Sequence, residues 1–272
     1  MIKASQTADY IVNWLQDYID NTPLKGFVVG VSGGIDSAVV STLCALTGKK
    51  TILVEMPIHQ GRDQVSRGKK HLNWVCENHE NVEQVELDLT DTYDGFVRSL
   101  EKVADINSSL GTKMLTLSNT RSRMRMMSLY ALAGVHQLLV CGTGNKVEDF
   151  GVGFYTKYGD GGVDLSPIAD LMKSEVFELG EYLGVNSDIL TARPTDGLWD
   201  DGRTDEDQIG ASYDELEWAM HLQSKLGNHP KDSDFANDRE REVWSIYLKM
   251  HLANLHKMQP IPICTIPESL KK

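Results

Sequence analysis

The sequence predicts an α/β protein with a doubly wound parallel sheet and helices on both of its faces. Short apolar runs alternate along the chain with longer segments of helical periodicity, as in successive strand–helix–strand units. The first strand leads through a glycine-rich turn (30–37) directly into a helix, an arrangement expected at the carboxyl edge of such a sheet. With 272 residues, 41% of them hydrophobic, the chain can bury a large core as one domain, with or without an appendage.

The N-terminal half is expected to supply three of the strands. It opens with an amphipathic helix that packs on the body, because five apolar residues recur at helical spacing: Ile11, Trp14, Leu15, Tyr18 and Ile19. Strands and helices then alternate in this order: a strand (26–29), a helix ending near Leu46, a strand (51–56), a polar helix (61–78) and a strand (82–87).

The rest of the chain, from residue 90, is expected to add one more strand and several helices. The predicted elements are helices over 90–103 and 118–137, a strand over 138–141, a glycine turn over 142–146, a glycine- and aspartate-rich loop over 154–162, and helices over 170–183 and 236–257. The stretch 199–207 is so acidic that we expect a lid or a mobile surface loop there. A loose tail rich in proline follows the last helix.

The turn after the first strand has the composition of a phosphate-binding loop. From Gly30 to Ser37 it reads Gly-Val-Ser-Gly-Gly-Ile-Asp-Ser. Adjacent glycines allow several backbone N–H groups to surround one anion, and the helix N-terminus adds the positive end of its dipole. Asp36 lies in the first turn of the helix, where a carboxylate could also hold Mg²⁺ against the phosphates.

Two commoner phosphate motifs are excluded at this turn. A Walker A loop ends in Gly-Lys-Ser or Gly-Lys-Thr, and no lysine lies between Gly30 and Ser37. The glycine spacing also differs from the Gly-x-Gly-x-x-Gly of dinucleotide-binding loops. The turn instead resembles the pyrophosphate loop of the ATP pyrophosphatases, which cleave ATP to AMP and pyrophosphate. The alternative is an ordinary glycine turn.

A second glycine turn (142–146) follows the fourth predicted strand, and Glu148 comes one helical turn later. The carboxyl ends of parallel strands lie at one edge of the sheet, so both turns are expected there. Together they predict a two-walled nucleotide site.

Charge and cysteine content limit the class of protein. There are 27 Lys and Arg against 39 Asp and Glu, and the resulting net charge of −12 disfavours a nucleic-acid partner. The cysteines are scattered and form no Cys-x-x-Cys pair, which indicates buried reduced thiols in a cytoplasmic protein and argues against structural zinc: Cys44, Cys76, Cys141 and Cys264. The polar N-terminus has no signal core and no apolar run reaches membrane-spanning length, so we expect no membrane partner.

Two groups of cations suggest bound anions. Arg121, Arg123 and Arg125 alternate along one predicted helix, so at most one or two of them share a target, and the alternative is a solvated basic face. Lys173 falls in the first turn of a predicted helix, where the dipole disfavours a cation. It therefore predicts an anionic partner, and a simple pair with Asp170 or Glu175 is the alternative to a ligand.

Five segments together resemble the ammonia-dependent NAD synthetases of the ATP pyrophosphatase (PP-loop) superfamily: 32–37, 119–125, 142–148, 154–162 and 194–198. The Thr-Lys-Tyr-Gly-Asp-Gly sequence within 154–162 is more specific than the shared pyrophosphate loop. The resemblance implies a single NAD synthetase domain over 1–272, with five parallel strands in an adenine nucleotide alpha hydrolase-like fold. It implies no glutaminase domain, so we expect free ammonia as the nitrogen donor, and supply by a separate subunit is the alternative.

The resemblance also implies a homodimer that converts deamido-NAD, ATP and ammonia into NAD, AMP and pyrophosphate with Mg²⁺. Asp36 and Lys173 would be catalytic, and Asp36 and Glu148 would hold the metal. The residues expected at ATP are Gly30, Val31, Ser32, Gly33, Gly34, Ile35, Asp36, Ser37, Thr143, Lys173 and Thr195. Those expected at deamido-NAD are Arg123, Lys157, Asp164, His256 and Lys257.

Two other functions stay open at this point. The chain could be another ligase of the same superfamily that acts on a different carboxylate, or a nucleotide-binding sensor that has lost catalysis. An assay with ATP, Mg²⁺ and ammonium, with and without deamido-NAD, separates the three.

Overall fold

The computed structural model describes residues 2–59, 62–103, 110–195 and 204–271. Within them, four parallel strands form a sheet in the order β3-β2-β1-β4: β1 (Gly26–Gly30), β2 (Lys50–Glu55), β3 (Val82–Glu86) and β4 (Leu139–Val140). The chain runs outward from β1 to β3 and then crosses back, so that β4 lies on the other side of β1. A ligand site is expected where the order reverses, at the carboxyl ends of β1 and β4.

Helices cover both faces of the sheet, as predicted. One face carries α1 (Ala4–Asp20), α2 (Ile35–Leu46), α3 (Arg62–Asn78), α6 (Lys173–Tyr182) and α7 (Ser187–Leu190), and the other carries α4 (Thr90–Leu100) and α5 (Leu110–His136). Successive side chains of a strand point to opposite faces. Phe27 and Val29 accordingly belong to the first core, whereas Val28 belongs to the second.

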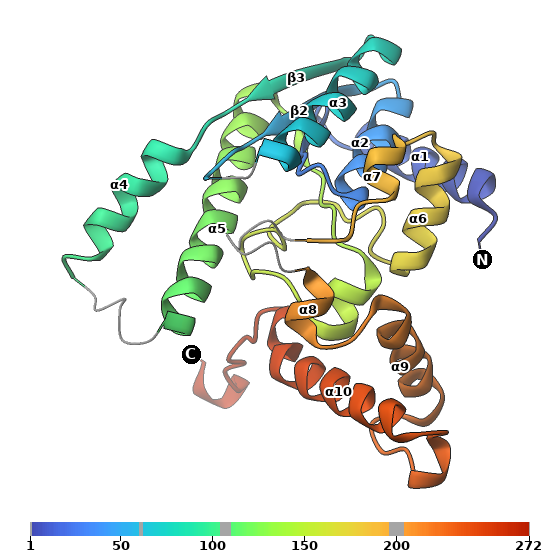
Figure 1. Cartoon of the computed structure of the whole chain (residues 1–272). Helices are drawn as coiled ribbons and strands as arrows, with labels where there is room; N and C mark the ends of the chain where they lie inside the picture. The colour runs from blue at the N-terminus through green and yellow to red at the C-terminus, as the bar shows by residue number, and fades with distance from the viewer. Residues whose placement is uncertain (1, 60–61, 104–109, 196–203, 272) are drawn as a thin grey trace.

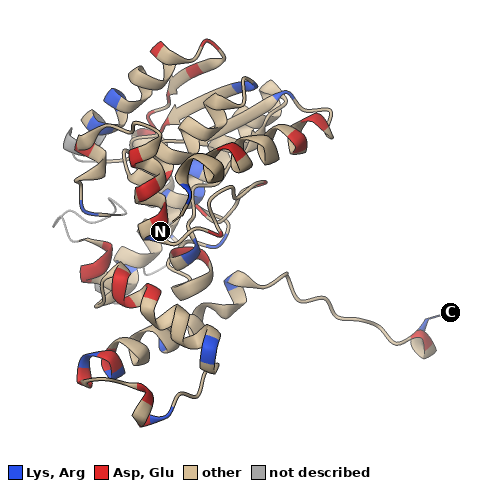
Figure 2. Ribbon diagram, turned by 90° about the vertical axis from the view of Figure 1, so that its right-hand side faces the viewer, with Lys and Arg blue, Asp and Glu red and all other residues tan. Residues whose placement is uncertain are grey.

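A further helical layer lies beyond the carboxyl edge of the sheet (Figure 1). It consists of the π-helical turn η1 (Val147–Val152), α8 (Asp205–Ile209), α9 (Tyr213–Leu226) and α10 (Asp238–Met258), with the short turns η2 (Asp232–Asp234) and η3 (Glu268–Leu270). Leu216 and Tyr247 are fully buried within a core of this layer. Figure 2 shows the tail after α10 leaving the body, with Ile261 and Ile263 exposed, which agrees with the loose tail predicted.

The five strands implied by the resemblance are not all formed, and that prediction is wrong for the described residues. The place beside β4 holds a single parallel bridge between Cys141 and Leu165. Gly142 N donates to Leu165 O at 2.7 Å, and Asp164 N donates to Val140 O at 2.9 Å. Pro167, two residues beyond, has no N–H with which to extend the ladder.

Three helix predictions also need correction. Trp14 and Tyr18 of α1 are exposed, with their tilted rings 5.9 Å apart, because the buried stripe is the narrower one through Ile11, Leu15 and Ile19. The helix predicted to start at 118 begins at Leu110, and the one predicted from 170 begins at Lys173.

The acidic stretch 199–207 is not a loop throughout. Residues 196–203 lie outside the described part, but Asp205–Ile209 is helical. The Thr204 side chain caps its first turn, where acidic residues suit the helix dipole. Thr204, Asp205 and Ile209 are buried, so the expectation of a mobile surface loop is wrong for this half.

The cysteines are free thiols, and two of the four are buried as predicted. Cys44 and Cys141 lie in the core with their sulfurs 3.6 Å apart. Cys76 is only half-buried and Cys264 is exposed on the tail, so burial was wrongly predicted for these two. No helix in the described ranges is both long and apolar enough to cross a membrane.

His71 on α3 is fully buried beside α2, and this position predicts acid sensitivity. Its Nε2 lies 2.8 Å from Ser41 Oγ, which itself donates to Ala38 O, so Nε2–H is the donor. Nδ1 is buried without a partner among the described residues. Burial lowers the pKa of His71 from 6.5 to about 4.

The folded protein should therefore lose stability as pH falls from neutral towards 4, because the unfolded chain binds the proton more readily. Between neutral pH and about pH 5 the expected loss is about 2 kcal/mol. Urea unfolding of wild type and His71→Gln at both pH values measures it, since glutamine keeps a donor to Ser41 and does not titrate. An equal loss in both proteins would assign the acid sensitivity to other groups.

Candidate active site

The phosphate loop lies at the carboxyl end of β1 and is organised by two serines. Val31 N still donates to Val54 O of β2 (2.9 Å), after which the chain turns at Gly33, whose φ of 80° suits glycine. Ser37 Oγ accepts from Ser32 N at 3.2 Å and donates to Gly34 O at 3.0 Å. These contacts fix the loop against the first turn of α2.

A buried ion cluster joins this loop to η1 and α6. Lys173 Nζ lies 2.6 Å from Asp36 Oδ2 and 2.9 Å from Glu148 Oε1. The lysine side chain is only 3% exposed, so the three charges are shielded from solvent. Burial alone would lower the pKa of Lys173, but Asp36 and Glu148 outweigh it and raise that pKa, which keeps the ammonium charged.

The cluster confirms that Lys173 has an anionic partner and rules out the simple pair. Asp170 instead pairs with Lys146 at 2.8 Å. Glu175 accepts from Met172 N at 2.9 Å and caps α6. The partners of Lys173 are 137 and 25 residues away in sequence, so no local pattern could identify them.

Three residues that were given no role in the sequence analysis hold the cluster in place. Asn145 is fully buried; its Nδ2 donates to Asp36 Oδ1 (3.0 Å) and its Oδ1 accepts from Glu148 N (3.1 Å). Tyr213 OH lies 2.6 Å from Glu148 Oε1 and 3.3 Å from Asp205 Oδ2, so α8 and α9 contact the site through one hydroxyl. Of the three, only Asn145 could have been recognised from the sequence, because it lies in the second glycine turn.

A cavity of about 660 Å³ opens in front of the cluster. Of the predicted site residues it is lined by Gly30, Val31, Ser32, Gly33, Gly34, Ile35, Asp36, Ser37, Thr143, Glu148, Lys173, Thr195 and Lys257. Every residue predicted at ATP therefore meets in one place. The side chains of Val31 and Ile35 are buried, so these two offer backbone rather than side-chain groups.

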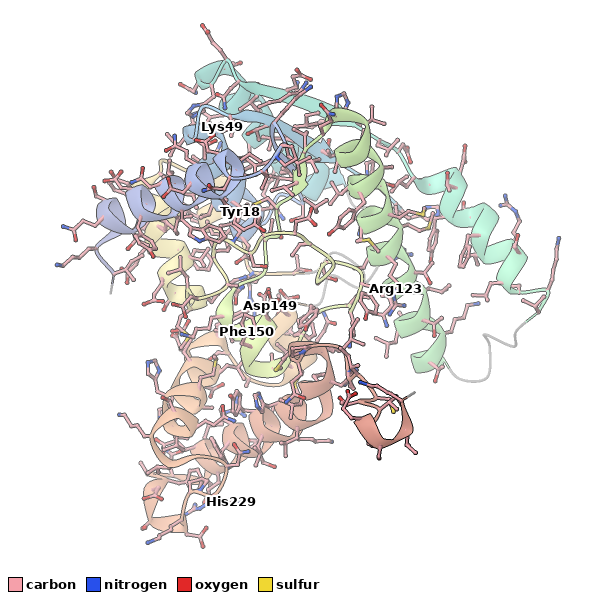
Figure 3. All side chains as sticks on the ribbon, turned by 180° about the vertical axis from the view of Figure 1, so that it is seen from behind. Tyr18, Lys49, Arg123, Asp149, Phe150 and His229 are labelled. Atoms are coloured by element: carbon pink, nitrogen blue, oxygen red, sulfur yellow. The ribbon has the colours of Figure 1, made fainter. Side chains whose placement is uncertain are left out.

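The residues predicted at deamido-NAD are not all in this cavity. Arg123 Nε donates to Lys157 O (3.3 Å), and Lys157 Nζ donates to His256 O (2.8 Å). These three lie next to one another outside the cavity lining, and Lys257 alone reaches it. Figure 3 shows Arg123 on α5, away from Asp149 at the centre of the molecule.

Asp164 is separated from the others and has a structural role. Its Oδ2 accepts from Val140 N at 2.8 Å, and its Oδ1 accepts from Tyr130 OH at 3.0 Å. Both carboxylate oxygens are thus used to hold the loop beside β4. Asp164 does not line the cavity.

The segments 119–125 and 154–162 are interlocked. Asp160 Oδ1 accepts from Ser122 Oγ (2.6 Å) and Thr156 N (3.0 Å), and Thr156 Oγ1 donates to Asn119 Oδ1 (2.7 Å). A Cβ on Gly159 would come within 2.2 Å of Ser122 Oγ, so glycine is required there. Asp160 belongs to the cavity wall, so its exposed surface faces the site.

Asp149 is a second carboxyl beside Glu148. Burial, with the nearby Glu148 and Asp160, raises the pKa of Asp149 to about 8. Its Oδ2 packs against Gly144, where an added Cβ would come within 2.1 Å of it. The glycine in the second turn thus makes room for a carboxyl.

The pair Asp36 and Glu148 fits a Mg²⁺ site that a nucleotide would complete. Both carboxylates reach the same Nζ, so they converge at the edge of the phosphate loop. In the parts of the chain that the structure describes, no group of three or more His, Cys, Asp or Glu could hold a metal alone. Mg²⁺ is usually bound by one or two carboxylates together with substrate phosphates and water.

Comparisons with known proteins agree with this geometry. Residues 7–261 match the family described as NAD synthase. The NH(3)-dependent NAD(+) synthetase of Carboxydothermus hydrogenoformans is 36% identical, covering 78% of this chain and 83% of that protein. The NH(3)-dependent NAD(+) synthetase of Methanococcoides burtonii is 34% identical, covering 93% of this chain and 92% of that protein. Among solved structures, an NMN synthetase from Francisella tularensis has a TM-score of 0.82 at 31% identity, covering 98% of this chain and 100% of the other.

Proposed function

The chain belongs to the NAD synthase family, and on that basis we propose that it joins ammonia to deamido-NAD while cleaving ATP to AMP and pyrophosphate. The observation that carries the proposal is the buried cluster of Lys173, Asp36 and Glu148 beside a phosphate loop that has no lysine. Lys173, together with a Mg²⁺ ion that the two carboxylates would hold, would compensate the charge on the phosphates of ATP, while the substrate carboxylate acts as nucleophile.

The first step activates the nicotinic carboxylate, which is too poor an electrophile to react with ammonia. One of its oxygens bonds to the α-phosphorus of ATP, and the bond from that phosphorus to the bridging oxygen breaks, so pyrophosphate leaves. The backbone N–H groups of the loop offset the charge on the phosphates. Lys173 has three ammonium protons, of which two go to Asp36 and Glu148, and one remains for a phosphate oxygen. Bound at these carboxylates, Mg²⁺ would neutralise further phosphate charge.

The second step forms the amide. The nitrogen of ammonia bonds to the acyl carbon, the bond from that carbon to the phosphate oxygen breaks, and AMP leaves with the electron pair. The nitrogen loses one proton to water, which leaves the neutral amide. No side chain becomes covalently attached, so the protein contributes positioning and charge compensation. NAD is a product here, which is consistent with the absence of a dinucleotide-binding fingerprint.

Product analysis tests the proposal. With ATP, Mg²⁺ and ammonium, we expect AMP and NAD in equal amounts only when deamido-NAD is present, and no ADP. Omitting Mg²⁺ should stop the reaction, since the proposal includes this ion. ADP and phosphate as products would contradict it. Binding of ATP without any turnover would favour the alternative function of a nucleotide-binding sensor that has lost catalysis.

One of the similar solved structures supports a second candidate substrate for this chain. The NMN synthetase from Francisella tularensis resembles this chain over nearly all of its length. The same two steps on nicotinic acid mononucleotide would yield NMN. Comparing kcat/KM for the dinucleotide and the mononucleotide decides between them, and a tenfold preference is about 1.4 kcal/mol of differential transition-state binding.

We also propose that the protein is a cytoplasmic homodimer that shares its active sites. Its four free cysteines are consistent with a reducing compartment. For the dimer, the support comes from α5, where Met127 and Val135 are 58% and 77% exposed. The same helix carries Arg123, which lies outside this chain's own cavity. A long dinucleotide could reach such an arginine on a partner subunit.

Subunit mixing tests the shared site. Asp36→Asn and Arg123→Ala homodimers should both be poorly active. When the two variants are refolded together in equal amounts, about half of the dimers should be mixed. Each mixed dimer should carry one intact site, so activity should recover to roughly a quarter of wild type. Mass spectrometry confirms that mixed dimers have formed. Mixed dimers without any recovery would place both residues in the same chain's site.

A further inference from the structure

A cation on the opposite side of the phosphate loop from Lys173 has no role so far. Arg67 lies on α3, which packs beside α2 and β2, and its side chain lines the cavity. Its neighbour Gly68 brings the helix against the loop, because a Cβ there would come within 3.7 Å of Gly33 N and 3.3 Å of Glu55 Oε1. The close approach of Gly68 places this turn of α3 next to the phosphate loop, and Arg67 and Gly33 line the same cavity.

Arg67 differs from the other cavity cations in having no partner within the described ranges. Its Nε is buried without a hydrogen bond. The other cations that line the cavity are engaged: Lys173 with Asp36 and Glu148, Arg193 with Glu206, Arg125 with Met56 O, and Lys257 with two carbonyl oxygens. Because Nε is buried, an anion in the cavity would bind the terminal nitrogens of the guanidinium, which carry four of its five N–H donors.

The carboxylates near Arg67 are already occupied. Asp188 on α7 holds Lys70 at 2.7 Å. Its pKa is lowered first by Lys70 and only to a smaller extent by Arg67. Burial raises the pKa of Glu55, and the charges that act on it are Lys69 and Glu86. The terminal N–H groups of the Arg67 guanidinium can therefore donate to an anion in the cavity.

Resting on the function proposed above, we propose that Arg67 binds the β- and γ-phosphates of ATP and then the pyrophosphate that leaves. The phosphate loop contains no lysine, so it has no cation of its own for the terminal phosphates. Lys173 occupies the side of β4 and α6, and Arg67 the side of β2 and α3. A guanidinium fork matches two phosphate oxygens at once, which a single ammonium does not.

Direct binding tests this role without turnover. Calorimetry with magnesium pyrophosphate should give a dissociation constant about 10- to 100-fold weaker for Arg67→Ala than for wild type, with Arg67→Lys between them. Binding of AMP, which lacks these phosphates, should change less than twofold. Lys70→Ala is the matched control, because it removes an exposed cation one turn further along the same helix.

Steady-state kinetics complete the test. Arg67→Ala should raise the KM for ATP and weaken inhibition by pyrophosphate, while the KM for deamido-NAD stays unchanged. Thermal denaturation checks the fold, and if the alanine variant does not fold, Arg67→Lys carries the same comparison. Pyrophosphate affinity within twofold of wild type, or a loss confined to AMP or deamido-NAD, would overturn the assignment. Arginine-dependent pyrophosphate binding in a protein that makes no NAD would instead overturn the function and leave this inference standing.

Discussion

Replacing Lys173 with methionine is expected to lower the free energy of unfolding by about 3–5 kcal/mol. Methionine fits the volume of the lysine stem but leaves Asp36 and Glu148 facing each other without the cation between them. The lysine is 2% exposed, so water cannot replace it without opening the site. An uncompensated buried charge costs far more than loss of a surface pair.

Urea unfolding at neutral pH measures this loss. Lys146→Met is the matched control: Lys146 pairs with Asp170, which is 97% exposed, and its removal should change stability by less than about 1 kcal/mol. The double variant Asp36→Asn with Lys173→Met should be more stable than Lys173→Met alone, because it removes one of the two facing charges. If the lysine variant were as stable as its control, or the double variant less stable than the single, the cluster would not be held by charge.

Much of the candidate ATP site could be predicted because it is local in sequence. The phosphate loop is one continuous turn between a strand and a helix, and glycine, serine and aspartate at these positions have direct physical reasons. Lys173 was predicted to need an anion because a cation opposes the dipole of a helix N-terminus. Its partners, however, depend on the topology that brings β1, β4 and α6 together.

The rest of the site could not be predicted because it depends on packing between distant segments. Tyr213 and Asp205 meet Glu148 only after the helical layer folds against the sheet. Nothing in the local sequence of Asp164 shows that both of its oxygens are used to hold β4. Arg67 sits in a polar helix of ordinary composition, and only the cavity distinguishes it from its neighbours.

The fifth strand illustrates the same limit in the fold. The resemblance supplied it, whereas the chain near Leu165 has one bridge and then Pro167. A parallel strand needs repeated donors along its edge. Periodicity over two or three residues cannot distinguish a bridge from a strand.

Asp36→Asn and Glu148→Gln are each expected to lower turnover on the order of 100- to 1000-fold while the fold stays intact. Each change removes one anionic oxygen and keeps the shape of the side chain. Lys173 retains one carboxylate partner in either variant, so neither should show the large instability expected of Lys173→Met. The loss should fall on kcat, because charge compensation is needed most when pyrophosphate departs.

Stopped-time assays of AMP and NAD at increasing Mg²⁺ measure this effect, and thermal denaturation checks the fold. Asp170→Asn is the matched control, since Asp170 is exposed and pairs only with Lys146 among the described residues. If Asp36 and Glu148 hold the metal, each variant should need more Mg²⁺ for half-maximal rate, whereas a residue that merely supports the loop would leave that requirement unchanged. If both variants turned over within a few-fold of wild type at saturating Mg²⁺, the carboxylates of Asp36 and Glu148 would have no role in catalysis. Lys173 would then be their structural partner and would not take part in the reaction.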